Sequence, residues 1–126
     1  MALSRGGSII NISSIYGMVA PNMNIYENLD FETEPDYPFI KGGIISFSKY
    51  LSSYYAKSNV RVNCVSPGGF FNNQPKLFID NYTSKTLSGR MANHDDMKGV
   101  AVFLASEASS YITGSIITVD GGFTTI

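Results

Sequence analysis

The 126-residue sequence has little of several features that mark whole classes of protein. It contains one cysteine, Cys64, so it cannot form an internal disulfide, and a reducing, cytoplasmic setting is expected. It contains one histidine, His94, and no cluster of cysteine and histidine residues, so no metal site is expected. The formal net charge of -1 gives no electrostatic attraction to nucleic acid or to an anionic membrane. No apolar run is long enough to cross a bilayer, and the start of the chain does not resemble a secretory signal.

Apolar residues are plentiful enough for a buried core. Hydrophobic residues make up 44% of the chain and charged residues 15%, which is typical of one small folded domain. The predicted strands lie in "GSIINISS" (7–14), "NVRVNCVSPGG" (59–69) and "GSIITVDGG" (114–122). The predicted helices follow Asp36, lie near 76–82, and cover "NHDDMKGVAVFLAS" (93–106), where Asn93 and Asp96 fit a capping box. This alternation predicts an α/β fold with a parallel sheet, and the apolar first strand is expected to be buried on both faces.

Two long connections, 15–36 and 70–90, leave the carboxyl ends of the first two predicted strands. Ligands of open parallel sheets bind beyond these strand ends, and loops of this length in a small domain are usually functional. The first connection carries half of the acidic residues and no lysine or arginine. This acidic stretch is interpreted either as a surface that favours an amino sugar or as a solvated loop face.

The helix after the first long connection begins with "YPFIK", Tyr37 to Lys41. Pro38 fits the first helical turn, where its missing N–H would have no partner, and Asp36 is the predicted N-cap. Residues four apart share a helix face, so the Lys41 ammonium can approach the Tyr37 phenol. Apolar residues at spacings of three or four then predict one stripe of a long amphipathic helix. The predicted stripe comprises Ile40, Ile44, Phe47, Leu51 and Tyr54.

A phenol beside an ammonium has a chemical and a purely structural interpretation. A positive charge about 4 Å away favours the phenolate by roughly 4 kcal/mol before desolvation, at an effective dielectric constant of about 20. Tyr37 could then exchange a proton with a substrate, while the hydroxyl of Ser14, at the end of a predicted strand, bonds a substrate oxygen. In the structural interpretation Tyr37 and Lys41 only form a solvated helix face, and Ser14 only satisfies a turn.

An ordered series of motifs decides between these interpretations, because it resembles the carboxyl-terminal half of a short-chain dehydrogenase/reductase. The series runs "NISS", Tyr37-x-x-x-Lys41, "RVNCVSPGG", "FLASEASSYITG" and "VDGG", and it covers almost the whole chain. The resemblance implies the C-terminal half of a Rossmann-like doubly wound parallel sheet, with the N-terminal nucleotide-binding half absent. Residues 1–126 would then form a single partial domain, the catalytic half of that fold.

The resemblance also implies the roles of individual residues. Ser14 would orient the substrate, Tyr37 would be the general acid and base, and Lys41 would hold the nicotinamide ribose and stabilise the phenolate. Tyr37 and Lys41 would therefore also contact the cofactor, which is NAD or NADP. The implied reaction is a reversible hydride transfer between that cofactor and a small-molecule alcohol or carbonyl substrate.

A second group of residues is implied to bind the cofactor. Pro67 and Gly68 match the turn that lies against the nicotinamide end, and Phe70 follows it closely. The family often has a threonine a few residues later that contacts the carboxamide, but Asn72 and Asn73 occupy that region here. Because the nucleotide-binding half is absent, the 126 residues alone are expected to lack dehydrogenase activity.

The segments "NISSIYGMVAPN" and "YPFIKGG" are similar to bacterial members of the family that are linked to flagellin or lipopolysaccharide sugars. This resemblance implies a sugar substrate in surface-glycan biosynthesis. Tyr16, Tyr26 and Phe31 would suit stacking on a sugar ring, or they would simply pack within the loop. Members of the family commonly pair through the helix after Tyr37, which implies a homo-oligomer, a dimer or tetramer, for the full-length protein.

Two other functions remain open at this point. An epimerase or dehydratase of the extended branch also uses Tyr-x-x-x-Lys, although such proteins carry a further substrate domain after the motif "VDGG". The other alternative belongs to a different class: a non-catalytic truncated homologue, or a subunit that only associates with a full-length partner. Intact Ser14, Tyr37 and Lys41 favour the enzyme.

Overall fold

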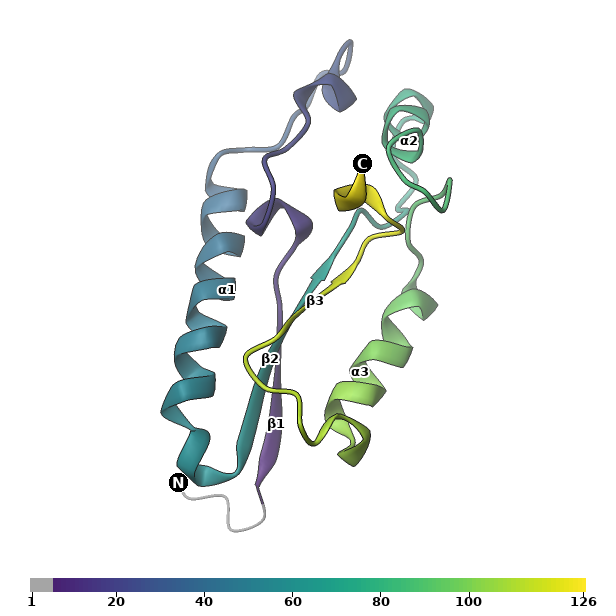
Figure 1. Ribbon diagram of the computed structural model, residues 1–126. Coiled ribbons are helices and arrows are strands. Elements are labelled where there is room, and N and C mark those ends of the chain that lie inside the picture. Colours follow the sequence, from purple (N-terminus) through teal and green to yellow (C-terminus); the bar gives the residue numbers. More distant parts are fainter. Residues whose placement is uncertain (1–5) are drawn as a thin grey trace.

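The computed structural model describes residues 6–126 as a parallel sheet with helices on both faces (Figure 1). The strands are β1 (Gly7–Ile12), β2 (Val60–Pro67) and β3 (Ile116–Val119). The helices are α1 (Asp36–Tyr54), α2 (Lys76–Thr83) and α3 (Lys98–Ala105). These elements confirm the predicted α/β fold and its parallel sheet. The first residues of the chain, on which the expectation about a secretory signal depends, lie outside the described part.

The strand order is β1-β2-β3, so β2 lies at the centre of the sheet. β2 pairs with β1 in a register that runs from Gly7↔Val60 to Ile12↔Val65. It pairs with β3 in a register that runs from Cys64↔Ile116 to Pro67↔Val119. The strand is buried from Val62 to Ser66. A nearly continuous apolar run is typical of a parallel strand that is covered on both faces.

β1 is less buried than its sequence predicts. Ile9 and Ile10 are half-buried, and Ile12 is exposed. Within residues 6–126 only β2 pairs with this strand, so β1 forms an edge of the sheet. The expectation that β1 is buried on both faces is therefore wrong for the described part of the chain, because an edge strand receives cover from fewer neighbours.

The helices α1 and α3 lie on opposite faces of the sheet (Figure 1). On the α1 side, the Asn11 side chain donates a hydrogen bond to Ser48 Oγ at 2.9 Å. On the α3 side, Ser8 Oγ and the Arg61 guanidinium both donate to the Leu104 carbonyl, at 2.7 and 3.0 Å. Both faces of the sheet are thus tied to helices by polar contacts as well as by packing.

The apolar stripe predicted for α1 is only partly buried. Ile44 and Leu51 are half-buried on the helix face that carries the buried Ser48. Ile40, Phe47 and Tyr54 are more than half exposed. The Phe47 and Tyr50 rings stack with centroids 6.3 Å apart on this outer surface, so α1 presents an aromatic row to its surroundings.

The predicted caps are right for one helix and wrong for the other. Asn93 and Asp96 form the expected capping box, ahead of a 3₁₀ turn that leads into α3. Asp36 is the first residue of α1 rather than its N-cap, because the chain enters the helix at Pro35 and no side chain caps it. Pro38 does lie in the first turn of α1, as predicted, and Tyr37 lies in the same turn.

A second apolar cluster lies beyond the carboxyl ends of the strands. It joins the 15–36 connection, α2 and the segment after β3 (Figure 1). Its buried members are Ile15, Ile25, Phe78, Tyr82, Met91 and Phe123. Because the two long connections pack on each other there, they form a fixed surface at the predicted ligand side of the sheet. No helix within residues 6–126 is long and apolar enough to span a bilayer.

Candidate active site

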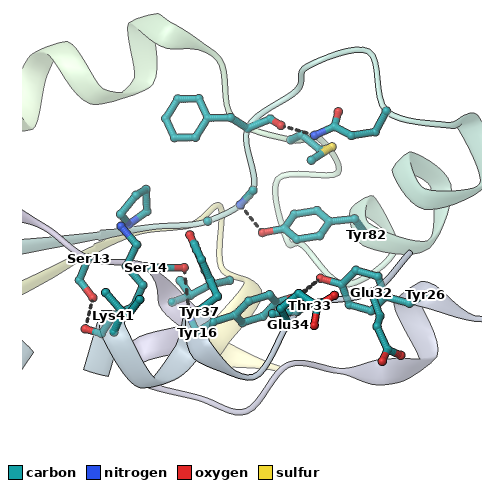
Figure 2. A pocket seen from close by; sticks show the side chains of 18 of the residues that line it. Ser13, Ser14, Tyr16, Tyr26, Glu32, Thr33, Glu34, Tyr37, Lys41 and Tyr82 are labelled. Atoms are coloured by element: carbon teal, nitrogen blue, oxygen red, sulfur yellow. Dashed lines mark hydrogen bonds between the residues drawn. The ribbon is translucent and has the colours of Figure 1, made fainter. Parts of the chain in front are cut away.

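A pocket of about 760 Å³ lies beyond the carboxyl ends of β1 and β2. It extends from the first turn of α1 to α2 and is bounded by both long connections (Figure 2). The structure brings all the residues predicted to form a site to this pocket. They are Ser14, Tyr37, Lys41, Pro67, Gly68 and Phe70. Residues from three separated parts of the sequence therefore share one cavity.

Two consecutive serines connect the end of β1 to α1. The buried Ser13 continues the sheet, since its N–H donates to the Val65 carbonyl at 2.8 Å, and its Oγ donates to the Lys41 carbonyl at 2.7 Å. Ser14 then turns the chain, and its Oγ accepts a hydrogen bond from the Tyr16 N–H at 3.2 Å. Capping occupies a lone pair of Ser14 but not its hydrogen, which can still donate to a ligand in the pocket.

A close backbone contact fixes the turn after Ser14 against α1. A Cβ added at Gly17 would lie 2.7 Å from the carbonyl carbon and oxygen of Lys41. No side chain fits in that space, so the turn approaches the helix at the residue that carries the ammonium. The glycine thereby sets the spacing between Ser14 and Lys41.

Tyr37 and Lys41 meet as their helical spacing predicts. The Lys41 Nζ lies 5.6 Å from the centroid of the Tyr37 ring, and it donates to the Ile12 carbonyl at 3.4 Å. In Figure 2, Ser14, Tyr37 and Lys41 lie together on one side of the pocket. Tyr37 is 43% exposed, so its ring can be reached by a ligand that enters the cavity.

The turn from Pro67 to Phe70 forms another part of the wall. The Gly68 N–H donates to the Val119 carbonyl at 2.9 Å, and Gly69 O accepts from the Ala92 N–H at 2.9 Å. The Gln74 side chain, which also lines the pocket, donates to Phe70 O and accepts from the Asn72 N–H, both at 2.7 Å. Gln74 therefore braces the loop after the turn.

Sequence reasoning directed attention to Asn72 and Asn73 and did not identify Gln74. Both asparagines are exposed and neither lines the pocket. Asn73 instead takes a left-handed backbone conformation, with φ of 55°, which asparagine tolerates better than most residues. No local sequence pattern indicates that Gln74 faces the cavity.

Tyrosines form a hydrogen-bonded group on the side of the pocket near the 15–36 connection. Tyr26 Oη donates to Tyr16 Oη at 3.4 Å and is also hydrogen-bonded to Thr33 (Figure 2). Burial, and then the hydrogen bond with Tyr26, raise the pKa of Tyr16 well above its ordinary value. Tyr16 therefore stays protonated at neutral pH, which suits it to hydrogen bonding and not to the role of a base.

Phe31 does not join the tyrosines in the pocket. Its ring packs on Phe78 and Tyr26, with centroids 5.5 and 6.1 Å away, and it is not among the lining residues. Of the two interpretations of Phe31, packing within the loop is therefore the correct one. Tyr16 and Tyr26 do line the cavity, so they remain available to a ligand.

The acidic stretch divides into two parts. Glu32, Glu34 and Asp36 line the pocket, whereas Glu27 and Asp30 do not. All five are exposed. The interpretation as a solvated loop face thus suits Glu27 and Asp30, while the other three carboxylates face the cavity as well as solvent.

Tyr82 is a pocket residue that sequence reasoning did not select. It is buried, and its Oη accepts a hydrogen bond from the Gly69 N–H (Figure 2). Burial raises the pKa of Tyr82, so its phenol remains neutral. The residue lies in a short helix with no chemical motif around it, and only the fold brings it to the Pro67–Gly69 turn.

Possible metal ligands are not clustered in the described residues. Residues 6–126 contain no group of three or more histidine, cysteine, aspartate or glutamate side chains that could hold a metal ion. The pocket is lined instead by hydroxyl, carboxylate and ammonium groups. Together with the parallel sheet, they define an α/β protein with a polar pocket at the carboxyl ends of its strands.

Comparison with known proteins identifies the family. A family model described as enoyl-(acyl carrier protein) reductase matches residues 1–124. The chain is 37% identical over 117 residues to post-translational flagellin modification protein A of Campylobacter coli. The aligned region covers 93% of this chain and 46% of that protein. The chain belongs to the short-chain dehydrogenase/reductase family, as its motifs predict.

Solved structures of the family show the same fold. A short chain dehydrogenase from Leptospira borgpetersenii, solved with bound NAD+, is 47% identical with a TM-score of 0.87, over 94% of this chain and 44% of that one. A gluconate 5-dehydrogenase from Burkholderia cenocepacia, in complex with NADP and tartrate, is 29% identical with a TM-score of 0.84, over 96% and 46%. The chain therefore spans about half the length of the relatives it matches.

Proposed function

We propose that this chain carries the catalytic residues of an oxidoreductase that transfers a hydride between NAD or NADP and an alcohol or carbonyl substrate. The observation that carries the proposal is the meeting of Ser14, Tyr37 and Lys41 in one pocket with the Pro67–Gly68 turn. Membership of a family of oxidoreductases supports the general reaction. The roles of the individual residues are those that the family resemblance implies, and their shared place in the pocket supports them.

Tyr37 is the group that exchanges a proton with the substrate oxygen. Tyr37 is partly exposed at the pocket and has an ammonium over its ring, whereas Tyr16 is hydrogen-bonded to Tyr26 and Tyr82 to Gly69. The positive charge of Lys41 stabilises the phenolate that forms when Tyr37 gives up its proton. A positioned acid and base of this kind typically contributes 10²–10⁴-fold to the rate.

Ser14 orients the substrate. Its backbone is fixed by the sheet through Ser13 and by the turn through Tyr16, so its hydroxyl has a defined direction. The same oxygen that receives the proton of Tyr37 can then accept a hydrogen bond from Ser14. This arrangement holds the substrate oxygen between two hydroxyl groups, which favours proton transfer to a single atom.

The pocket also fits the nicotinamide end of a dinucleotide. Gly68 and Gly69 bring backbone without a side chain to the pocket wall, which a flat ring can approach closely. A Cβ at Gly68 would lie 3.0 Å from Asp120 Cα, so the position cannot readily accept a larger residue. The Lys41 ammonium supplies donors for ribose hydroxyls. When bound, the cofactor would supply the hydride, which no side chain of the chain can carry.

The proposed substrate is a sugar or a similar polyhydroxylated compound. The ring of Tyr16 offers a stacking surface, and Glu32 and Glu34 offer acceptors for hydroxyl or amino groups at the pocket. The similarity to a flagellin modification protein supports a place in surface-glycan biosynthesis. A preference for acyl thioesters, which the description of the matching family model suggests, is an outcome that the same substrate tests would reveal.

The proposed enzyme is a homo-oligomer, a dimer or tetramer, that forms through α1 in the cytoplasm. Phe47, Tyr50 and Tyr54 are exposed along this helix, and their rings stack in sequence with centroids 6.3 and 6.0 Å apart. Aromatic residues of this kind are enriched at the centres of interfaces.

Light scattering of the active protein should show a dimer or larger species, and Tyr50→Glu should shift it towards the monomer.

The function can be tested in an assay protein in which this chain replaces the part of the Leptospira dehydrogenase that it matches. The high fold similarity supports that exchange. Tyr37→Phe should lower turnover by at least about 100-fold and leave cofactor affinity unchanged, since only the proton-transferring hydroxyl is lost. Tyr111→Phe, which removes a fully exposed hydroxyl, is the matched control.

Three results would favour other functions. Turnover of Tyr37→Phe near the parent rate would remove this residue from the mechanism. Product formation without net oxidation or reduction of the cofactor would indicate an epimerase or dehydratase. A folded assay protein that binds cofactor but converts neither sugars nor acyl thioesters would indicate a non-catalytic homologue.

A further inference from the structure

The Pro67–Gly69 turn is held by three contacts from different parts of the chain. The Gly68 N–H donates to Val119 O, and Gly69 O accepts from the Ala92 N–H, both at 2.9 Å. These two bonds connect the turn to the last strand and to the segment before α3. The third contact, from the Gly69 N–H to the Tyr82 hydroxyl, is the one made to a side chain.

The ring of Tyr82 is itself fixed. It is 3% exposed and stacks on Phe123, with centroids 4.9 Å apart and planes at 22°. Asp120 holds the segment that carries Phe123, because its carboxylate accepts hydrogen bonds from Gly122 N–H at 3.0 Å and from Thr124 N–H and Oγ1 at 2.8 and 2.7 Å. Tyr82 thus offers its oxygen to the turn from a rigid support.

The turn also lies in van der Waals contact with Tyr82. A Cβ added at Gly69 would lie 2.8 Å from Tyr82 Cζ, and one added at Gly68 would lie 3.0 Å from Tyr82 Oη. Tyr82 lines the main pocket and a second cavity of about 190 Å³, and both glycines line them too. Without the phenol, the turn would have open space into which it could move.

We propose that Tyr82 is a positioning residue, whose phenol sets the place of the Gly68–Gly69 turn and thereby the wall on which the nicotinamide end of the cofactor rests. The inference rests on the proposed function, which places the cofactor against this turn. The hydroxyl has a purpose that packing does not explain: a phenylalanine would fill the same core position beside Phe78 and Phe123. Only a tyrosine also supplies an acceptor to the Gly69 N–H.

The test replaces Tyr82 by phenylalanine in the assay protein, with Tyr111→Phe as the control that loses an exposed hydroxyl. Amide hydrogen exchange of the peptide around Gly69 is measured by mass spectrometry, and cofactor affinity is measured by nicotinamide fluorescence. Tyr82→Phe should speed exchange at this peptide and raise the Kd for NADH or NADPH about fivefold, the effect expected of one neutral hydrogen bond. The control should change neither.

Unchanged exchange around Gly69 would overturn the proposal, and so would faster exchange with an unchanged Kd. If Tyr82→Phe fails to fold, Gly69→Ala takes its place, because the added Cβ pushes the turn from the ring while Tyr82 remains. An unchanged Kd in that variant would also overturn the proposal. Neither readout requires turnover, so an inactive parent protein or an unaffected Tyr37→Phe would count against the proposed reaction and not against this inference.

Discussion

The two sides of the pocket are built in different ways. On one side, Ser14, Tyr37 and Lys41 lie at the end of a strand and at the start of a helix, and backbone geometry places them. On the other side, the Pro67–Gly69 turn depends on Gln74 and Tyr82, whose side chains hydrogen-bond its backbone or that of the following loop. The groups proposed to react lie at the ends of regular elements, whereas side chains add to the backbone hydrogen bonds that hold the opposite surface.

This difference leads to an expectation for mutants. A change on the first side removes a reacting or charged group and should lower turnover strongly. A change on the second side moves a wall and should mainly weaken binding.

Apart from the loss of the Tyr37 hydroxyl, removal of the charge on the reactive side should have the largest effect. Lys41→Ala should lower turnover and cofactor affinity, each by about 10- to 100-fold, because charge-assisted hydrogen bonds and phenolate stabilisation are lost together. The matched control is Lys49→Ala, an exposed lysine on the same helix. Steady-state kinetics and fluorescence titration on the assay protein measure both quantities. A loss of turnover with unchanged cofactor affinity would show that Lys41 does not bind the ribose of the cofactor.

The spacing on the reactive side should be sensitive to one methyl group. Gly17→Ala places a Cβ 2.7 Å from the Lys41 carbonyl, so the turn that carries Ser14 must move away from α1. We expect a loss of about 1–3 kcal/mol in the free energy of unfolding, together with lower turnover. The control is Gly99→Ala in α3, where nothing lies within 4 Å of the added atom and a gain of about 0.5–1 kcal/mol is expected. Denaturant unfolding measures the stability of both variants. Equal stabilities of Gly17→Ala and Gly99→Ala would contradict the close contact between Gly17 and Lys41.

The predictability of the site from sequence follows the same division. Ser14, Tyr37 and Lys41 could be predicted because helical spacing and a strand end place them near one another, and because the ordered motifs that contain them resemble a known family. Tyr82 could not, because its partner Gly69 lies across a loop and no local pattern relates them. Phe47 and Tyr54 share the predicted stripe of α1 with the half-buried Ile44 and Leu51, yet both are exposed. Periodicity groups residues on one side of a helix but does not tell how much of that side is covered.

The smallest effect concerns the loop before α3, outside the reactive side. The Arg90 guanidinium, and then the Asn93 N–H, hold the pKa of Asp96 well below its usual range. Such a group stabilises the fold above its unfolded-state pKa, and this contribution is lost as the pH falls through the lower folded-state pKa. The Tm of the parent should therefore fall more than that of Asp96→Asn between about pH 5 and about pH 2. If the Tm of the two proteins changes with pH in parallel, the ion pair between Arg90 and Asp96 contributes nothing measurable to stability.

The central claim is that proton transfer belongs to one side of the pocket and positioning to the other. It is tested most directly by measuring kcat and the cofactor Kd for Tyr37→Phe and Tyr82→Phe side by side in the assay protein. We predict that Tyr37→Phe lowers kcat by at least about 100-fold at unchanged Kd, and that Tyr82→Phe raises Kd about fivefold with kcat within about twofold of the parent. The same pattern in both variants, or a large loss of kcat only in Tyr82→Phe, would contradict the account.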